Sequence, residues 1–280
     1  MTERIWILDY NGRLGNRLKL LTHVAAAALA HRRRISNPAF WKYRAGFAAW
    51  KNSCTDFLPG FAQLAIPARA ERVGRGIFLT LARIATAGGV PGIGWLRCPD
   101  DRQISLEGEE FSRILRQGPR HLLLWGYNFS APQTVRSQRE ALRNLFQPAR
   151  PPAKPSRFTL AVHIRRGDYR EFDQGRYFFS RENYLHWIRQ ALARWREHQP
   201  RCLVFSDEDP GEAIRREPGV ELAGGDLFDD LFRMAASDVI LGPPSSFSDW
   251  AAWYGGVKRL RIESAQQELR TGDLVGVEVP

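Results

Sequence analysis

The chain has 280 residues, of which 44% are hydrophobic and 25% charged, and its formal net charge is +11. This composition is typical of a soluble globular protein with one large or two ordinary domains. The three cysteines, Cys54, Cys98 and Cys202, are widely spaced and odd in number. That pattern argues against a disulfide framework or a cysteine metal site and favours a reducing compartment. The excess arginines are spread along the chain, so a nucleic-acid-binding stripe is not indicated.

The N-terminal segment lacks the charged-then-apolar layout of a secretion signal. The longest apolar stretch near it, Leu20–Ala30, is too short to span a bilayer and contains His23. We therefore expect a cytoplasmic protein.

The first half of the chain opens with a predicted strand at Ile5–Leu8, a loop at Asp9–Asn16 and an Ala/Leu-rich helix at Arg17–Arg32. Strand, glycine-containing loop and helix together form the opening of a nucleotide-binding type of unit. Residues 36–105 show no clean period, and only a helix at Ile77–Ala87 is predicted there. The remaining elements predicted in this half are a helix at Glu107–Arg116, a strand at His121–Trp125 and a helix at Pro132–Phe146.

The stretch Gln147–Ser156 holds four prolines, which is a linker composition. It predicts a boundary between a domain at 1–150 and a second at 151–280. Strands and helices then alternate, which implies right-handed crossovers and a parallel sheet. The predicted strands are Phe158–Ile164, Cys202–Phe205, Val220–Leu222, Val239–Leu241 and Lys258–Ile262. The predicted helices are Ser180–Arg196, Pro210–Arg216, Asp226–Ala236 and Ser246–Tyr254.

The most informative stretch is Phe158–Tyr169, FTLAVHIRRGDY, an apolar strand that ends in charged residues. In open α/β sheets, ligands bind outside the carboxyl ends of strands. Neighbouring residues at a strand end point to opposite sides, so Arg165 shares a side with His163 and Arg166 lies on the other. Two permanently charged guanidiniums there suit a diphosphate. The pattern favours an enzyme that handles a phosphate-bearing substrate over a pair of solvated arginines.

Carboxylates follow within a few residues, at Asp168, Glu171 and Asp173. A hydroxyl acceptor needs a general base, and any of the three is a candidate. For Asp168 we favour a salt bridge that orients an arginine. A DxD-type metal site would use Asp207 and Asp209 in the CLVFSDED stretch. Because arginines already supply positive charge, we favour a ligand-side loop without metal.

A third block runs from Asp226 to Trp253. Asp230 lies in an amphipathic helix, and Pro243–Pro244 leads into Ser245-Ser246-Phe247-Ser248 at the start of the next helix. Hydroxyls and free N–H groups at a helix N-terminus form a phosphate site, although simple N-capping is an equal alternative. Near the N-terminus, GRLGN at Gly12–Asn16 gives a weaker phosphate signal, in which Arg13 and Asn16 are candidates to face a cleft.

Several blocks together resemble the GDP-fucose-dependent α1,2/α1,6-fucosyltransferase superfamily, which also includes protein O-fucosyltransferases. Gly12–Asn16 resembles its N-terminal G-x-G-N/Q loop, Val162–Tyr169 its H-x-R-R-x-D/N motif and Phe205–Asp209 its F-S-D-D block. Asp230–Asp238 and Ser245–Trp250 resemble its D-x-F-L-M…SSFSWW block, with Asp249 in place of the first tryptophan. HIRRGDY and SSFS fit the α1,2 branch, glycosyltransferase family 11, best.

The resemblance implies an α/β, GT-B-like fold of two Rossmann-type domains with parallel sheets facing a central cleft. It implies an inverting, metal-free transferase with no cofactor besides its donor substrate. By position, His163 and Asp230 would contact the guanine or ribose, and Arg165 the diphosphate. Arg166 would stabilise the charge on departing GDP. The other donor-contacting positions implied are Gly15, Asn16, Tyr184, Asp207, Ser246, Phe247 and Ser248.

The sequence thus predicts transfer of L-fucose from GDP-fucose to a glycan hydroxyl, with an α1,2-fucoside as product. The N-terminal domain would be the acceptor side and the C-terminal domain would bind the GDP-sugar. The alternatives are a transferase for another sugar nucleotide such as GDP-mannose, a non-catalytic glycan- or nucleotide-binding relative, and a basic nucleic-acid-binding module, which the spread of arginines disfavours. The basic, aromatic Trp41–Trp50 region adds the option of peripheral association with an anionic inner membrane face.

Overall fold

The computed structural model describes residues 3–8, 12–50, 80 and 89–280. The chain divides into two compact units, Met1–Ala149 and Arg150–Pro280, and each is described by itself. The break falls inside the proline-rich stretch 147–156. Apart from Thr80, the predicted helix at Ile77–Ala87 lies outside the described residues.

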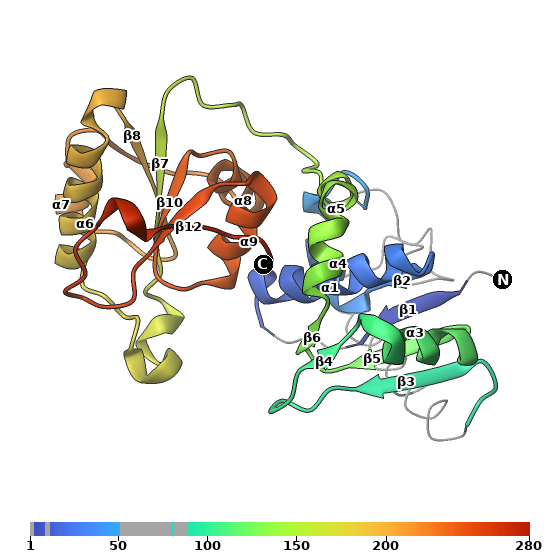
Figure 1. The fold of residues 1–280 in the computed structure, drawn as a ribbon. Helices are drawn as coiled ribbons and strands as arrows, with labels where there is room; N and C mark the ends of the chain where they lie inside the picture. The colour runs from blue at the N-terminus through green and yellow to red at the C-terminus, as the bar shows by residue number, and fades with distance from the viewer. Residues whose placement is uncertain (1–2, 9–11, 51–79, 81–88) are drawn as a thin grey trace. The chain divides into compact units, whose positions relative to one another are not determined.

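The first unit is built on a four-stranded, fully parallel sheet in the order β2-β1-β5-β3 (Figure 1). Its strands are β1 (Arg4–Ile7), β2 (Arg34–Ser36), β3 (Ile93–Arg97) and β5 (His121–Trp125). A small parallel ladder joins β4 (Ile104–Ser105) to β6 (Phe129–Ser130). The helices are α1 (Leu14–Ala30), α3 (Gly108–Gln117), α4 (Pro132–Ser137) and α5 (Arg139–Leu145), with a 3-10 segment η1 (Pro38–Gly46). In these ranges the first unit is α/β with the predicted strand–loop–helix opening.

Two features of this unit differ from the sequence expectation. The predicted helix at Pro132–Phe146 is two helices, because α4 ends at Ser137 and α5 begins at Arg139. The Ser137 hydroxyl donates to the Thr134 carbonyl (3.1 Å), which competes with the backbone pattern that would continue the helix. Strand β3 was not predicted, since Gly94 interrupts its apolar pattern; a Cβ there would lie 2.5 Å from Pro119.

Phe47 and Trp50 of the Trp41–Trp50 region belong to a core. Phe40, Phe47, Trp50 and Phe146 meet at ring-centroid distances of 5.5–5.9 Å. Trp50 is 6% exposed and Phe47 is fully buried. These side chains therefore stabilise the first unit, and the membrane association suggested for the region stays a prediction. None of the helices in the described ranges combines the length and hydropathy of a membrane span.

The second unit is a six-stranded sheet in the order β12-β11-β10-β7-β8-β9. Its strands are β7 (Thr159–Ile164), β8 (Arg201–Ser206), β9 (Val220–Leu222), β10 (Val239–Gly242), β11 (Lys258–Arg261) and β12 (Leu274–Gly276). All pairs are parallel except β11 with β12, an antiparallel edge strand that the sequence did not predict. The helices are α6 (Arg181–Arg194), α7 (Glu212–Arg215), α8 (Leu227–Ala235) and α9 (Ser246–Gly255). The short 3-10 segments are η2 (Asp168–Arg170), η3 (Phe172–Gly175), η4 (Arg196–His198) and η5 (Thr271–Asp273).

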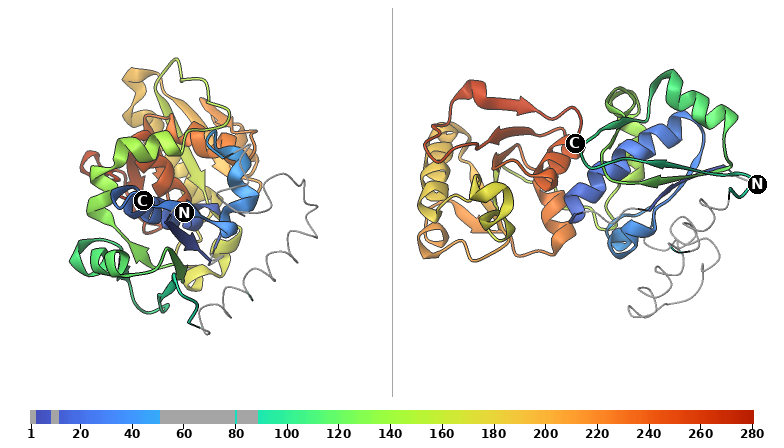
Figure 2. Two further views of the ribbon diagram at one scale, coloured as in Figure 1. Left: turned by 90° about the vertical axis from the view of Figure 1, so that its right-hand side faces the viewer. Right: turned by 90° about the horizontal axis from the view of Figure 1, so that it is seen from below.

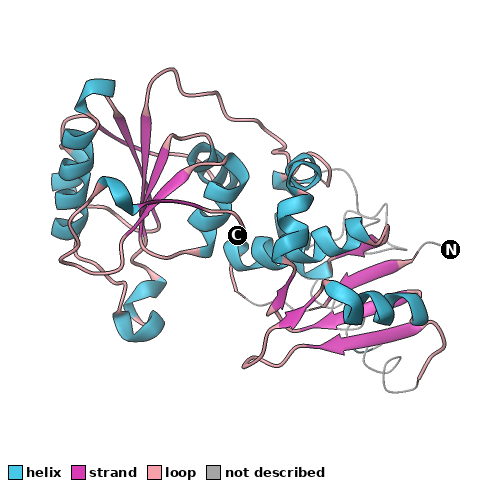
Figure 3. Ribbon diagram, viewed as in Figure 1, coloured by secondary structure: helices cyan, strands magenta, loops and turns pink. Residues whose placement is uncertain are grey.

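Helices cover both faces of this sheet, α6 and α7 on one face and α8 and α9 on the other (Figures 1 and 3). All six residues of β7 are buried, as expected for a central strand enclosed on both sides. Figure 2 shows the same two helix layers of this unit from a second direction. The second unit is thus a doubly wound, Rossmann-type sheet.

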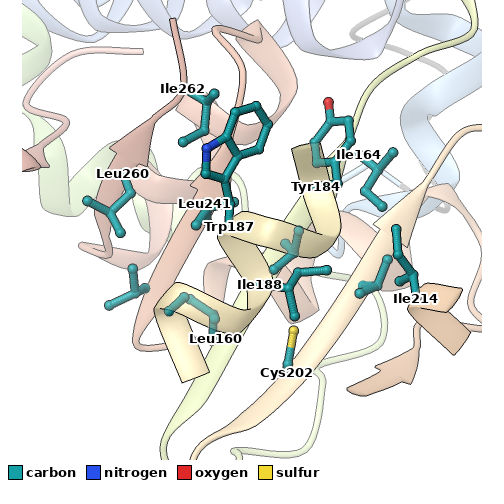
Figure 4. Close-up of a cluster of buried hydrophobic side chains, with 14 of the residues drawn as sticks. Leu160, Ile164, Tyr184, Trp187, Ile188, Cys202, Ile214, Leu241, Leu260 and Ile262 are labelled. Atoms are coloured by element: carbon teal, nitrogen blue, oxygen red, sulfur yellow. The ribbon is translucent and has the colours of Figure 1, made fainter. Parts of the chain in front are cut away.

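The core between α6 and the sheet fixes the end of β7 (Figure 4). Tyr184, Trp187 and Ile188 of α6 are fully buried and pack in one cluster with Ile164 of β7. Burial of each such side chain contributes about 1.5–3 kcal/mol. The Trp187 indole also donates to the Gln267 carbonyl (2.8 Å), so its polar edge is satisfied. This packing holds the residues after Ile164 in a defined position.

Candidate active site

The site lies at the topological switch point of the second unit. Strand β7 is bonded on one side to β8, which follows it through α6, and on the other to β10, which comes later in the chain. The connections from β7 and β10 therefore run to opposite sides of the sheet. A crevice between diverging loops at such a point is where doubly wound sheets bind ligands.

The backbone after β7 is held by an acid on β8's loop and a tyrosine on α6. Asp207 Oδ1 accepts hydrogen bonds from the N–H groups of Arg166 (3.0 Å) and Gly167 (3.2 Å). The Tyr184 hydroxyl accepts from the Arg165 N–H (3.2 Å). Asp207 and Tyr184 thus position the arginine loop, and the donor contacts expected of them stay predictions.

Arg165 is bound to two carboxylates. Its Nη2 lies 2.7 Å from Asp168 Oδ1 and its Nη1 lies 2.8 Å from Asp207 Oδ2. The guanidinium also lies 5.5 Å from the centre of the Tyr169 ring. The salt bridge expected for Asp168 is present, and the charge of Arg165 is compensated within the protein.

Arg166 turns to a different set of partners. Its Nε pairs with Glu208 and its Nη1 donates to the Phe179 carbonyl. The guanidinium lies 4.3 Å from the centre of the Phe178 ring. Within the described residues its Nη2 has no protein partner and is free to donate to a ligand. The side chains of Arg165 and Arg166 thus point in different directions, as predicted from the alternation of side chains at a strand end.

His163 is buried and lacks a partner on one ring nitrogen. Its ring lies 5.7 Å from that of Phe247 at the start of α9. Among the described residues, Nδ1 is buried without a hydrogen bond. Burial, together with the charges of Arg165 and Arg259, lowers the pKa of His163 to about 3. The imidazole is therefore neutral at physiological pH and has a polar atom available to a bound molecule.

Asp230 is a half-buried group with one buried oxygen that has no partner among the described residues. Asp226 caps α8 by accepting from the N–H groups of Phe228 and Asp229, so Asp230 is not needed for capping. In the described structure Asp230 Oδ1 is buried without a partner. Burial, with help from Asp229 and Asp226, raises the pKa of Asp230 to about 7. A carboxyl group whose pKa is raised this far is typical of a ligand site.

The first turn of α9 differs from those of α6 and α8. Ser180 and Asp226 form reciprocal capping boxes on α6 and α8. Ser245, the N-cap of α9, forms no side-chain cap bond. The N–H groups of Phe247 and Ser248 therefore donate no bond to the N-cap side chain, and the ring of His163, with its unpartnered Nδ1, lies beside Phe247 in this turn.

The serines of this turn are not equivalent. Ser246 and Phe247 are half-buried at the start of the helix. Ser248 is fully buried, and its hydroxyl donates to the Ser245 carbonyl (3.3 Å). The Ser248 hydroxyl thus makes a local helix contact, and its expected pocket-lining role stays a prediction.

The three candidate bases lie in the loop Gly167–Phe178, whose 3-10 turns project beyond the end of the sheet (Figure 1). Asp168 is engaged by Arg165, and Asp173 lies 4.0 Å from Arg176. Within the described residues, the exposed carboxylate of Glu171 has no partner. Glu171 and Asp173 are therefore freer than Asp168 to accept a proton.

The acids considered for a metal point to separate partners. Asp207 holds the arginine loop, whereas Asp209 pairs with Arg215 (2.8 Å) and accepts from the Gly211 N–H (3.0 Å). They are committed to protein donors and do not converge on one point.

The glycine loop of the first unit follows β1, and its residues 9–11 lie outside the described ranges. Gly12 has a φ of +69°, and a Cβ there would lie 2.3 Å from Asn16. Gly15 is buried in the first turn of α1, and Arg13 and Asn16 are exposed. Arg17 Nε donates to the Gly12 carbonyl (3.0 Å), which closes the turn.

Sequence reasoning missed two residues that shape the site. Arg259, in β11, is fully buried and donates to the Gly242 (3.3 Å) and Pro243 (3.0 Å) carbonyls. It also pairs with Asp249 in the first turn of α9. An arginine within an apolar strand pattern and an aspartate where the motif has tryptophan were the available signals, and their pairing required the fold.

Neither a protein-family model nor a curated protein matches the chain. Among solved structures, it is similar to an Arabidopsis thaliana FUT1 mutant in complex with GDP, with a TM-score of 0.58, 12% identity, and 98% of this chain and 74% of that chain covered. It is also similar to POFUT1 in complex with GDP-fucose, with a TM-score of 0.50, 14% identity, and 96% and 97% covered. The chain therefore has the α/β, GT-B-type fold of these fucosyltransferases.

Proposed function

We propose that this protein is a GDP-fucose-dependent glycosyltransferase whose second unit binds the donor. The observation that carries the proposal is that elements flanking the switch point carry polar groups without a protein partner in the described residues. The uncapped first turn of α9 lies beside the unpartnered nitrogen of His163, and Arg166 offers a free nitrogen at the adjacent strand end. These groups suit an anionic ligand with a polar ring system.

The donor would be divided between two parts of the site. The diphosphate would accept from the first-turn N–H groups of α9 and from Ser246. The unpartnered oxygen of Asp230 suits a planar group with adjacent N–H donors, as guanine has on its N1 and 2-amino positions. His163 would contact the nucleoside, and the donor contacts expected of Gly15 and Asn16 from the motif stay predictions.

In the proposed reaction, an acceptor hydroxyl oxygen attacks C1 of fucose from the face opposite GDP. The new C1–O bond forms as the bond to the β-phosphate oxygen breaks, so a β-linked donor gives an α-fucoside. The hydroxyl proton passes to a carboxylate, and negative charge grows on the departing GDP. Arg166 and the α9 N–H groups would stabilise that charge, which makes a bound metal unnecessary in this proposal.

We propose Glu171 or Asp173 as the base and Asp168 as the residue that orients Arg165. Both Asp168 oxygens lie within hydrogen-bond distance of Arg165 Nη2 (2.7 and 2.8 Å). Protonation of Asp168 would have to break that ion pair. Glu171 carries no such constraint in the described structure.

The acceptor is proposed to be an oligosaccharide hydroxyl, and the α1,2 linkage rests on the HIRRGDY and SSFS motifs. A different sugar nucleotide such as GDP-mannose, or binding without turnover, is the competing outcome of the test.

The test measures GDP release from GDP-fucose in EDTA with a panel of small glycan acceptors. We expect metal-independent turnover that Arg166→Ala abolishes and Arg189→Ala retains, since Arg189 pairs with Glu217 on the outer side of α6. Turnover with GDP-mannose alone would change the donor, and binding without turnover would favour a non-catalytic relative. If no sugar nucleotide binds, the proposal is wrong.

A further inference from the structure

A fully buried arginine stabilises the turn between β10 and α9. Arg259 donates to the carbonyls of Gly242 (3.3 Å) and Pro243 (3.0 Å). From the β7 side, the Tyr169 hydroxyl donates to the Pro244 carbonyl (2.5 Å). Three successive carbonyls are therefore turned toward internal donors.

This arrangement decides which way the following amides face. In a planar trans peptide, the N–H of the next residue points opposite the carbonyl. Pro243 and Pro244 have no N–H, so the first such group is that of Ser245, directed away from Tyr169. The internal donors thus turn the Ser245 N–H, at the N-cap of α9, outward.

The same arginine belongs to a group with uncompensated charge. Asp249 pairs with both Arg259 and Arg261 (2.8 Å to the latter). Neither arginine has another ion pair in the described structure, so two guanidiniums share one carboxylate. Arg259 Nε is buried without a partner, and burial lowers the pKa of Arg259. A net positive charge therefore lies next to the first turn of α9, which has no side-chain cap.

Arg165 and Arg166 are balanced, since Asp168, Asp207 and Glu208 compensate them. Arg181 also lies 3.9 Å from Glu208, so three guanidiniums there face three carboxylates. The motif arginines contribute donors with fixed geometry, but the unbalanced positive charge at this switch point belongs to Arg259 and Arg261.

We propose that Arg259 is a positioning residue for the donor's diphosphate, acting through the Gly242–Pro244 turn and through the charge that it shares with Arg261. This inference rests on the proposed function. Arg259 has no exposed surface, so it directs the Ser245 amide and attracts the diphosphate without contacting it.

The experiment is calorimetric titration of the full chain with GDP and with guanosine, for wild type, Arg259→Met and Arg259→Lys. We expect Arg259→Met to weaken GDP binding by at least about tenfold and guanosine binding much less. Arg259→Lys keeps the charge, but its single ammonium group cannot reach both carbonyls and Asp249. Its GDP affinity should therefore lie between that of wild type and that of Arg259→Met. A purely structural role would weaken both ligands equally.

Arg261→Gln provides a second variant in case Arg259 substitutions fail to fold, because the Arg261 side chain is 40% exposed. We expect a several-fold loss for GDP, none for guanosine, and a shallower salt dependence. Arg189→Gln is the matched control and should bind both ligands like wild type. Unchanged GDP affinity in folded Arg259→Met or Arg261→Gln would overturn the inference while leaving the proposed function intact. Absence of GDP binding by wild type would overturn both.

Discussion

The loop after β7 and the turn after β10 meet at one switch point but are stabilised in opposite ways. The loop carries the recognisable motif, and its arginines are balanced by Asp168, Asp207 and Glu208. The turn has no charged residue of its own, yet it lies next to a buried arginine and a partly exposed one that share a single carboxylate. The number of arginines in the motif therefore does not give the positive charge that a ligand meets, because ion pairs inside the protein neutralise part of that charge.

The largest expected effect comes from the loop. Arg166→Ala should lower kcat by about 100- to 1000-fold, because it removes a donor aimed at the charge on departing GDP. Single-turnover kinetics with GDP-fucose would measure it. A comparable loss in Arg189→Ala would show that general destabilisation, and not leaving-group chemistry, is responsible.

Substitutions of the loop carboxylates should distinguish the general base from the acid that orients Arg165. Glu171→Gln or Asp173→Asn should lower kcat by about 100-fold, with little change in KM, if it removes the general base. Asp168→Asn should cost less and act mainly on KM, because it loosens Arg165. The account of these residues fails if Asp168→Asn has the largest kcat effect of the three.

The pH dependence of nucleotide binding should report Asp230. Its pKa is raised to about 7, and the ionised form accepts the guanine N–H groups, so affinity should be full above pH 7 and fall below it. The pKa of His163 is lowered to about 3, so this group does not titrate in that range. GDP titrations between pH 5.5 and 8.5 should lose this one-proton step in Asp230→Asn, and an identical profile would exclude the role.

The same shift has the opposite sign for stability of the free protein. An acid whose pKa is higher in the folded state binds more protons there, so Asp230 costs stability as pH rises from about 4 to 7. Because the side chain keeps some solvent access, Asp230→Asn should raise stability at pH 8 by only about 1 kcal/mol. Urea unfolding at pH 5 and pH 8 measures this, and an equal change at both values would contradict it.

Gly242→Ala should have the smallest effect on turnover of the variants considered, but it should clearly lower the free energy of unfolding. The added Cβ would lie 2.5 Å from the His163 carbonyl, where β10 approaches β7. Such overpacking costs about 1–3 kcal/mol. Gly224→Ala is the control, since a Cβ there meets nothing within 4 Å. Equal unfolding midpoints for the two variants would show that the close approach relaxes without cost.

The sequence predicted regular elements well where hydrophobic period and caps agreed. The strand His121–Trp125 and the N-cap Ser180 are confirmed as predicted. The strands Arg34–Ser36 and Ile93–Arg97 were missed because they are short and their burial depends on partners distant in the chain. Periodicity in one segment does not report such pairing.

Within the candidate site, the motif residues that surround the ends of β7 and β10 could be found from the sequence. Their ion pairs could not, because Asp207 and Arg165 are 42 positions apart and meet only through the β7–β8 pairing. The pairing of Asp249 with Arg259 depends in the same way on the return from α9 to β11.

The most direct test of the account is the ratio of GDP to guanosine affinity in the wild-type protein in EDTA. An unbalanced positive charge beneath uncapped α9 predicts that GDP binds at least about 100-fold more tightly, and that this ratio falls as salt rises. Equal affinity for the two ligands, or no GDP binding, would contradict the claim that this switch point is a diphosphate site.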